Sequence, residues 1–299
     1  AGTVILGNAT TNSTYSGGTT VNGGTLKAGS SFQPFGTGAV TETSSGGVVI
    51  NLNGQTITNA LTLYGDGISS TGALINGNSG ATGSVSGDIT LGSAVTINAT
   101  NGITSTGRVT GAFGLTEIGS GTLTLGNATT NSTYSGGTTV NGGTLKAGSS
   151  FQPFGTGAVT EITTGEVVID LNGKTISNAL TLYSAATPTV YALTSGVTGG
   201  IQQTGTVTLG SNVLLGLTTG KTMTINGVIA DTNAYTLTVN KIGDTGTVIF
   251  GGANTYTGAT TVNAGTLQVS GSGTVGNTSS LLTLSSATLD LRNGLTIGS

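Results

Sequence analysis

The most constraining feature of this chain is that it repeats itself. Residues 7–42 and residues 126–161 are identical over thirty-six positions, at an offset of 119 residues. The similarity continues from Val48–Tyr64 to Val167–Tyr183, and a third, looser copy reads TYTGATTVNAGTL from Thr255 to Leu267. Self-similarity at a long fixed period is typical of stacked structural units. We therefore expect an array of similar turns, continuous from residue 1 to residue 299.

The composition favours a folded chain with few sites for charged partners. Charged residues make up only 6% of the sequence, while Val, Ile and Leu alternate with Thr in short runs. A formal net charge of −3 without a basic cluster argues against nucleic acid as a partner. No apolar run approaches the ~20 residues needed to span a bilayer. We expect no membrane insertion of this segment.

Short strand patterns recur along the chain and end at Gly, Ser-Gly or Asn-Gly. Asn-Gly adopts positive φ at little steric cost and is therefore typical of the turns between strands, although it also occurs in antiparallel hairpins. The period favours a solenoid over a sandwich, because five or six turns of roughly 20 to 24 residues fit into one repeat. The predicted fold is all-β, a parallel β-helix (β-solenoid) of roughly 13 turns. The copies are expected at about residues 1–114 (a partial start), 115–236 and 237–299 (partial).

Two local motifs are interpreted as structural. The SFQPFGTGAV segments place Phe32, Pro34 and Phe35 together at an expected corner, where we predict local core under a loop, with a ligand-stacking aromatic pair as the alternative. GSGTVG, with Gly271, Gly273 and Gly276 in GxGxxG spacing, is followed by a strand pattern and not by a helix. Its glycines are therefore predicted to be turn residues.

The side chains needed for most hydrolytic chemistry are missing. The chain has no His and no Cys, which removes nucleophilic triads, histidine bases and most zinc sites. Paired carboxylates remain open in principle. The acids are sparse, and Glu42 and Glu161 occupy equivalent positions in two copies, so we interpret them as surface groups. The one local cluster is Glu161, Glu166 and Asp170, with Lys174 nearby. We predict no catalytic residue, cofactor or metal site.

Three tyrosines occupy one position of the repeat. Tyr15, Tyr134 and Tyr256 each precede the sequence x-Gly-x-Thr-Thr-Val. One hypothesis is a row of rings on which glycans stack. The alternative is that each ring flanks a turn and packs on its neighbour.

The segments TYSGGTTVNGGTL and TYTGATTVNAGTL resemble the autotransporter-associated β-strand repeat, or passenger-associated repeat, of bacterial surface proteins. The stretch from Gly114, GLTEIGSGTLTLGNATTNSTYSGG, and the later VVINLNG follow the same family pattern. The resemblance implies a right-handed parallel β-helix that is secreted and displayed outside the bacterial outer membrane. It implies no active residues.

These observations predict a non-enzymatic extracellular segment on a bacterial cell surface, serving as a rigid stalk, adhesin or fibre. Expected partners are further copies of the chain, end to end or laterally, and cell-surface glycans or other cells. The alternatives are a polysaccharide lyase or hydrolase, or a glycan-binding module, on the same helix. Because residue 1 is not Met and no signal peptide is recognisable, we expect a processed chain or part of a longer one.

Overall fold

The structure of the chain is a computed structural model. The structure describes residues 1–299 except 44–45, 163–165, 185–189, 198–201, 204 and 293–299. The chain divides into two compact units, residues 1–157 and residues 158–299. The expectation of a single continuous solenoid stays a prediction.

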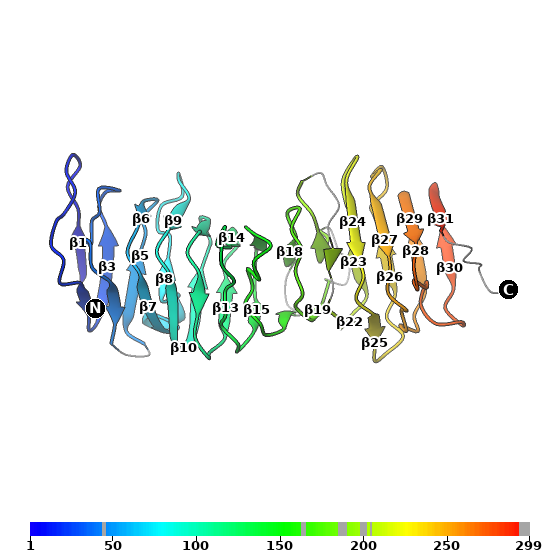
Figure 1. The fold of residues 1–299 in the computed structure, drawn as a ribbon, viewed down its shortest axis with the longest axis horizontal. Helices are drawn as coiled ribbons and strands as arrows, with labels where there is room; N and C mark the ends of the chain where they lie inside the picture. Colours follow the sequence, from blue (N-terminus) through cyan, green and yellow to red (C-terminus); the bar gives the residue numbers. More distant parts are fainter. Residues whose placement is uncertain (44–45, 163–165, 185–189, 198–201, 204, 293–299) are drawn as a thin grey trace. The chain divides into compact units, whose positions relative to one another are not determined.

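The first unit consists of short strands that follow one another as successive turns (Figure 1). One short 3-10 helix, η1 (Ile68–Ser70), interrupts them. The strands are β1 (Thr3–Leu6), β2 (Thr19–Val21), β3 (Gly24–Ala28), β4 (Val40–Glu42), β5 (Val48–Asn51), β6 (Thr56–Ile57), β7 (Leu61–Gly65), β8 (Leu74–Ile75), β9 (Gly83–Val85), β10 (Ile89–Asn98), β11 (Ile103–Ser105), β12 (Val109–Thr110), β13 (Leu115–Ile118), β14 (Thr122–Leu125), β15 (Thr138–Val140) and β16 (Thr144–Ala147).

The strands of the first unit form three ladders. One runs β1-β3-β5-β8-β10-β13-β15, the second runs β2-β4-β7-β10-β12, and the third runs β6-β9-β11-β14-β16. The long strand β10 belongs to the first two ladders, with a register shift between Leu91 and Val95. Each turn of the chain thus contributes one short strand to each face that it crosses.

The second unit is built in the same way. Its ladders run β17-β19-β22-β25, β18-β20-β23-β26-β28-β30 and β21-β24-β27-β29-β31. The strands are β17 (Val159–Glu161), β18 (Val168–Asp170), β19 (Leu180–Leu182), β20 (Leu193–Thr194), β21 (Gln202–Gln203), β22 (Val207–Leu209), β23 (Val213–Leu215), β24 (Thr222–Ile225), β25 (Ile229–Asp231), β26 (Leu237–Val239), β27 (Thr247–Phe250), β28 (Thr260–Val262), β29 (Gly265–Val269), β30 (Leu282–Leu284) and β31 (Ala287–Leu291).

Strand pairing confirms the predicted parallel β-solenoid. The described pairs within each unit are all parallel, and the paired residues lie one turn apart in sequence. Turn length varies more than expected, from 19 residues between Thr247 and Thr266 to 30 between Gly65 and Val95, next to the register shift in β10. Summed over both units, the turns number about 12, close to the roughly 13 predicted.

Columns of aliphatic side chains fill the interior. In the first unit, Leu26, Ile50, Leu74 and Ile97 lie in register on neighbouring strands of one ladder. All four are at most 4% exposed. Because alternate residues of a strand point to opposite faces, Thr25 beside Leu26 and Thr96 beside Ile97 point away from this column. Burial of these columns is the main stabilising term available to a chain with so few charges.

The corners use left-handed backbone, though not always where Asn-Gly predicts it. Asn53 and Gly54 both have positive φ, and so do their copies Asn172 and Gly173. At Asn22-Gly23-Gly24, by contrast, the positive φ falls on Gly24 alone. The motif with Gly271 and Gly276 is a turn, with both glycines at positive φ and no helix after it in the described residues up to 292, as predicted.

The two identical copies do not lie on the same face of the first unit. Val4 pairs with Leu26, and the register continues through Ile50, Leu74 and Ile97 to Glu117, five turns and 113 residues later. The copy of Val4, however, is Leu123, which lies on β14 in a different ladder. The 119-residue repeat is therefore five turns plus the short step to the next face.

Candidate functional site

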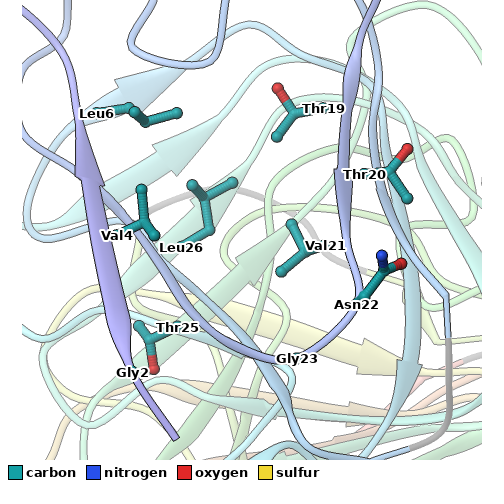
Figure 2. A pocket seen from close by; sticks show the side chains of 10 residues that line it. All are labelled: Gly2, Val4, Leu6, Thr19, Thr20, Val21, Asn22, Gly23, Thr25 and Leu26. Carbon is teal, nitrogen blue, oxygen red and sulfur yellow. The ribbon is translucent and has the colours of Figure 1, made fainter.

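A recess lined by both aliphatic and polar side chains lies at the first turn of the first unit (Figure 2). It is lined by Gly2, Val4, Leu6, Thr19, Thr20, Val21, Asn22, Gly23, Thr25 and Leu26, from β1, β2 and β3. Figure 2 shows the side chains of Val4, Val21 and Leu26 directed toward a common space. Val4 is 58% exposed and Ile5 is 61% exposed. This is an unusual exposure for aliphatic residues in strands.

In the second copy, the residues that correspond to Val4 and Leu6 are covered by a neighbouring turn. Leu123 and Leu125, the copies of Val4 and Leu6, are fully buried. They lie under β11, whose Ile103 and Ser105 pair with them in register. The sequence at the first turn is therefore suited to contact with another turn of the same kind.

The three repeat tyrosines lie in the same local structure but differ in exposure. Tyr134 and Tyr256 are fully buried, while Tyr15 is 41% exposed. Each phenol oxygen is close to the Oγ1 of the threonine four residues later, at 2.8 Å for Tyr15 and 2.6 Å for the other two. A buried ring has no face free for a sugar, so stacking at Tyr134 or Tyr256 would require the turns to separate. At Tyr15 the glycan-stacking hypothesis stays a prediction.

The predicted aromatic loops combine one core ring and one exposed ring. Phe35 and its copy Phe154 are fully buried, whereas Phe32 is 44% exposed and its copy Phe151 is 42% exposed. The Phe35 ring therefore matches the local-core interpretation. Phe32 instead lies at the surface, where its carbonyl accepts a hydrogen bond from the Ser13 backbone N–H.

The interpretation of Glu42 and Glu161 as surface groups is wrong. Glu42 is 1% exposed and Glu161 is fully buried. Each occupies an inward-facing position at the end of its strand, and one carboxylate oxygen accepts a hydrogen bond from a backbone N–H of the next turn. The donors are Tyr64 N, 2.6 Å from Glu42 Oε2, and Tyr183 N, 2.8 Å from Glu161 Oε2. Strand alternation in VTE places the Glu on the same side as the buried Val, a signal that sequence reasoning missed.

Glu117 is a third buried carboxylate. It is fully buried on β13, in register between Ile97 and Val140. Both of its carboxylate oxygens are without a hydrogen-bond partner, as are Oε1 of Glu42 and Oε1 of Glu161. Loss of water around the carboxylate raises the pKa of Glu42 and Glu117 to about 8 and that of Glu161 well above its usual range. The hydrogen bonds from Tyr64 and Tyr183 oppose this rise at Glu42 and Glu161.

The acidic cluster predicted from sequence is divided between the interior and the surface. Glu161 is buried, whereas Glu166 is exposed. Asp170 is 8% exposed, and its Oδ1 accepts hydrogen bonds from Asn172 N at 2.8 Å and Gly196 N at 2.7 Å. Asn51, its counterpart in the first copy, accepts the same two kinds of bond from Asn53 N and Gly77 N. Asp170 thus joins one turn to the next.

Buried asparagines link neighbouring turns and were also missed from sequence. Asn59 is 2% exposed, and its Nδ2 donates to the carbonyls of Phe35, Gly36 and Gly38 at 3.2, 3.0 and 2.7 Å.

No group of three or more His, Cys, Asp or Glu side chains suited to a metal ion is found in the described part of the chain. The described residues also contain no helix long and apolar enough to cross a membrane.

The stacked parallel turns define a β-solenoid repeat protein. A family model described as the passenger-associated-transport-repeat matches residues 1–28, 115–147 and 243–269. Each matched segment contains one of the repeat tyrosines, so the resemblance seen in the sequence is confirmed and the chain carries three copies of this repeat. No curated protein and no solved structure shows significant similarity to the chain. Repeat and fold together indicate a passenger-type structural segment of a secreted or cell-surface protein.

Proposed function

We propose that this chain is a structural segment of a protein displayed on a bacterial surface, where it acts as a rigid stalk, adhesin or fibre without enzymatic activity. The observation that carries the proposal is the in-register stacking of parallel turns over aliphatic columns, in a chain with three passenger repeats. Backbone ladders within each unit resist bending, because the described turns of a unit are hydrogen-bonded to their neighbouring turns. The proposed role therefore depends on the stiffness of the stacked turns and not on a chemical reaction.

The recess at the first turn supports a role for self-association. Its residues match positions that are covered by a neighbouring turn in the second copy. We propose that another turn of this repeat type covers Val4, Leu6 and Tyr15, and that turns from separate chains can do so to form filaments. Unpaired strand edges of this kind are templates for further pairing.

Electron microscopy of the purified chain at rising concentration tests the filament. Filaments that lengthen with concentration are expected, and Val4→Lys should shorten them because it places a charge in the recess, against the incoming turn. The matched control is Ile242→Lys, at a position that is 89% exposed and outside the recess. Short dispersed particles at every concentration would refute end-to-end assembly while leaving the stalk role intact.

The second candidate function is action on a polysaccharide. Its only support is the presence of Glu161, Glu166 and Asp170 within one stretch of ten residues. The test is turnover of uronic-acid polymers by the native chain and by the three corresponding amide variants. Turnover that is lost in the variants would establish the enzyme, and absence of turnover by the native chain would dismiss it.

A glycan-binding role is tested at the exposed member of the tyrosine row. If sugars stack on Tyr15, Tyr15→Ala should abolish binding on a glycan array, whereas Phe113→Ala, which removes another exposed ring, should not. Binding that survives Tyr15→Ala would leave the ring with a packing role only.

A further inference from the structure

The three buried glutamates share an environment that does not support a negative charge. The chain contains four glutamates, of which Glu42, Glu117 and Glu161 lie in the interior and Glu166 is exposed. Moving an ionised carboxylate out of water without a partner costs far more than moving its neutral form. Each buried position therefore favours the protonated acid.

The ladder neighbours of Glu42 and Glu117 are aliphatic. Glu42 is paired with Val21, and Glu117 lies between Ile97 and Val140. The strands that pair with β4, β13 and β17 within their units are β2, β7, β10, β15 and β19. Their only titratable side chain is Tyr64, which contacts Glu42 through its backbone N–H.

The lack of hydrogen-bond donors around the carboxylate oxygens also favours the protonated acid. Glu117 has no hydrogen-bond donor at either oxygen, and Glu42 and Glu161 have one donor each. A stable buried carboxylate normally accepts several hydrogen bonds or pairs with a cation. Among the described groups, no positive charge contributes to the protonation equilibrium of any of the three.

We propose that folding of this chain is coupled to proton binding at Glu42, Glu117 and Glu161, so that the solenoid binds protons as it forms and loosens as the solution becomes alkaline. The first unit holds two of these groups and the second unit holds one.

The direction of the effect follows from the two protonation states. In the unfolded chain each carboxyl has its ordinary pKa near 4.5, while burial raises the pKa of Glu42 and Glu117 to about 8. Below the ordinary value both states are protonated and stability is highest. Between these two values the folded state holds a proton that the unfolded state has lost. Stability therefore falls as pH rises through this window, and each group raises the unfolding constant by about tenfold per pH unit.

The first experiment measures urea unfolding by circular dichroism at several values between about pH 5 and about pH 8. Hydrogen exchange of peptides from each unit separates the two responses. Glu42→Gln and Glu117→Gln should each reduce the pH slope of the first unit, and Glu161→Gln should reduce that of the second. Glu166→Gln is the matched control and should leave both slopes unchanged, because Glu166 is an exposed residue and not a buried one. Wild-type slopes in all three buried variants would overturn the proposal.

A second measurement does not depend on whether the variants fold. Carbon-13 labelling of the glutamate carboxyls in the native chain gives four signals that can be followed against pH. Three signals are expected to remain those of the neutral acid at about pH 6, well above the ordinary range. Ionised signals for all four glutamates at that pH would refute proton binding by the fold.

Discussion

In the first unit, the phenol oxygen of Tyr134 lies 2.6 Å from Oγ1 of Thr138, and both residues are almost completely buried. The pair recurs as Tyr256 and Thr260 in the second unit, again at 2.6 Å. A hydrogen bond in the interior satisfies two polar groups that would otherwise have no hydrogen-bond partner. The tyrosine of the passenger repeat thus joins the loop before a strand to the strand itself.

Tyr134→Phe should destabilise the first unit by about 1–3 kcal/mol, because Thr138 Oγ1 loses its partner in the interior. Tyr15→Phe removes the same hydroxyl at a half-exposed position, where water can replace it. Thermal unfolding of both variants compares the two sites. Equal losses of stability in the two variants would mean that burial does not determine how much the Tyr–Thr hydrogen bond contributes to the free energy of unfolding.

Gly155→Ala should be strongly destabilising. Gly155 has φ 64°, and an added Cβ would lie 2.3 Å from the Tyr134 carbonyl oxygen. The left-handed backbone alone costs an alanine about 1–2 kcal/mol, to which the steric repulsion adds. Gly17→Ala is the control, since its Cβ would meet nothing within 4 Å. A melting temperature of Gly155→Ala equal to that of the control would contradict this loop geometry.

Asn59→Ala should cost about 1–3 kcal/mol, because the carbonyls of Phe35, Gly36 and Gly38 lose a shared donor. Asn59→Asp should be worse at neutral pH, since a carboxylate would then face three carbonyl oxygens. Asn12→Ala, at an exposed position, serves as the control. Urea unfolding ranks the three, and an aspartate variant as stable as the native chain would show that Asn59 is not a donor here.

Deamidation should distinguish the Asn-Gly sites. In this reaction the glycine N attacks the asparagine Cγ, ammonia leaves, and water opens the ring to aspartate or isoaspartate. Asn22 and Gly23 are both exposed. The Gly54 N–H that follows Asn53 instead donates to Asn76 Oδ1 at 2.7 Å. Peptide mass spectrometry after prolonged incubation should find Asn22 converted before Asn53. The reverse order would mean that the hydrogen bond gives no protection.

The strand positions and the solenoid architecture were predictable because burial in a β-solenoid follows simple alternation. Gly24–Ala28 and Leu61–Gly65 are strands with alternating burial, where the sequence shows Gly-Thr-Leu-Lys-Ala and Leu-Thr-Leu-Tyr. The candidate site was harder to predict. Glu42 looked like a surface residue because acids are rarely buried, yet its position in Val40-Thr41-Glu42 obeys the same alternation and directs it inward.

The repeat, the short strands and the aliphatic inward-facing positions could all be predicted from the order of the amino acids, because these properties are local and recur with each copy. The face on which each copy lies could be found only from the folded chain. Turn length depends on how many residues each corner absorbs, and those corners differ along the chain, so 119 residues do not make a whole number of turns. Leu123 is therefore the copy of Val4 in the sequence. The residue that lies in the same ladder register as Val4, five turns later, is Glu117.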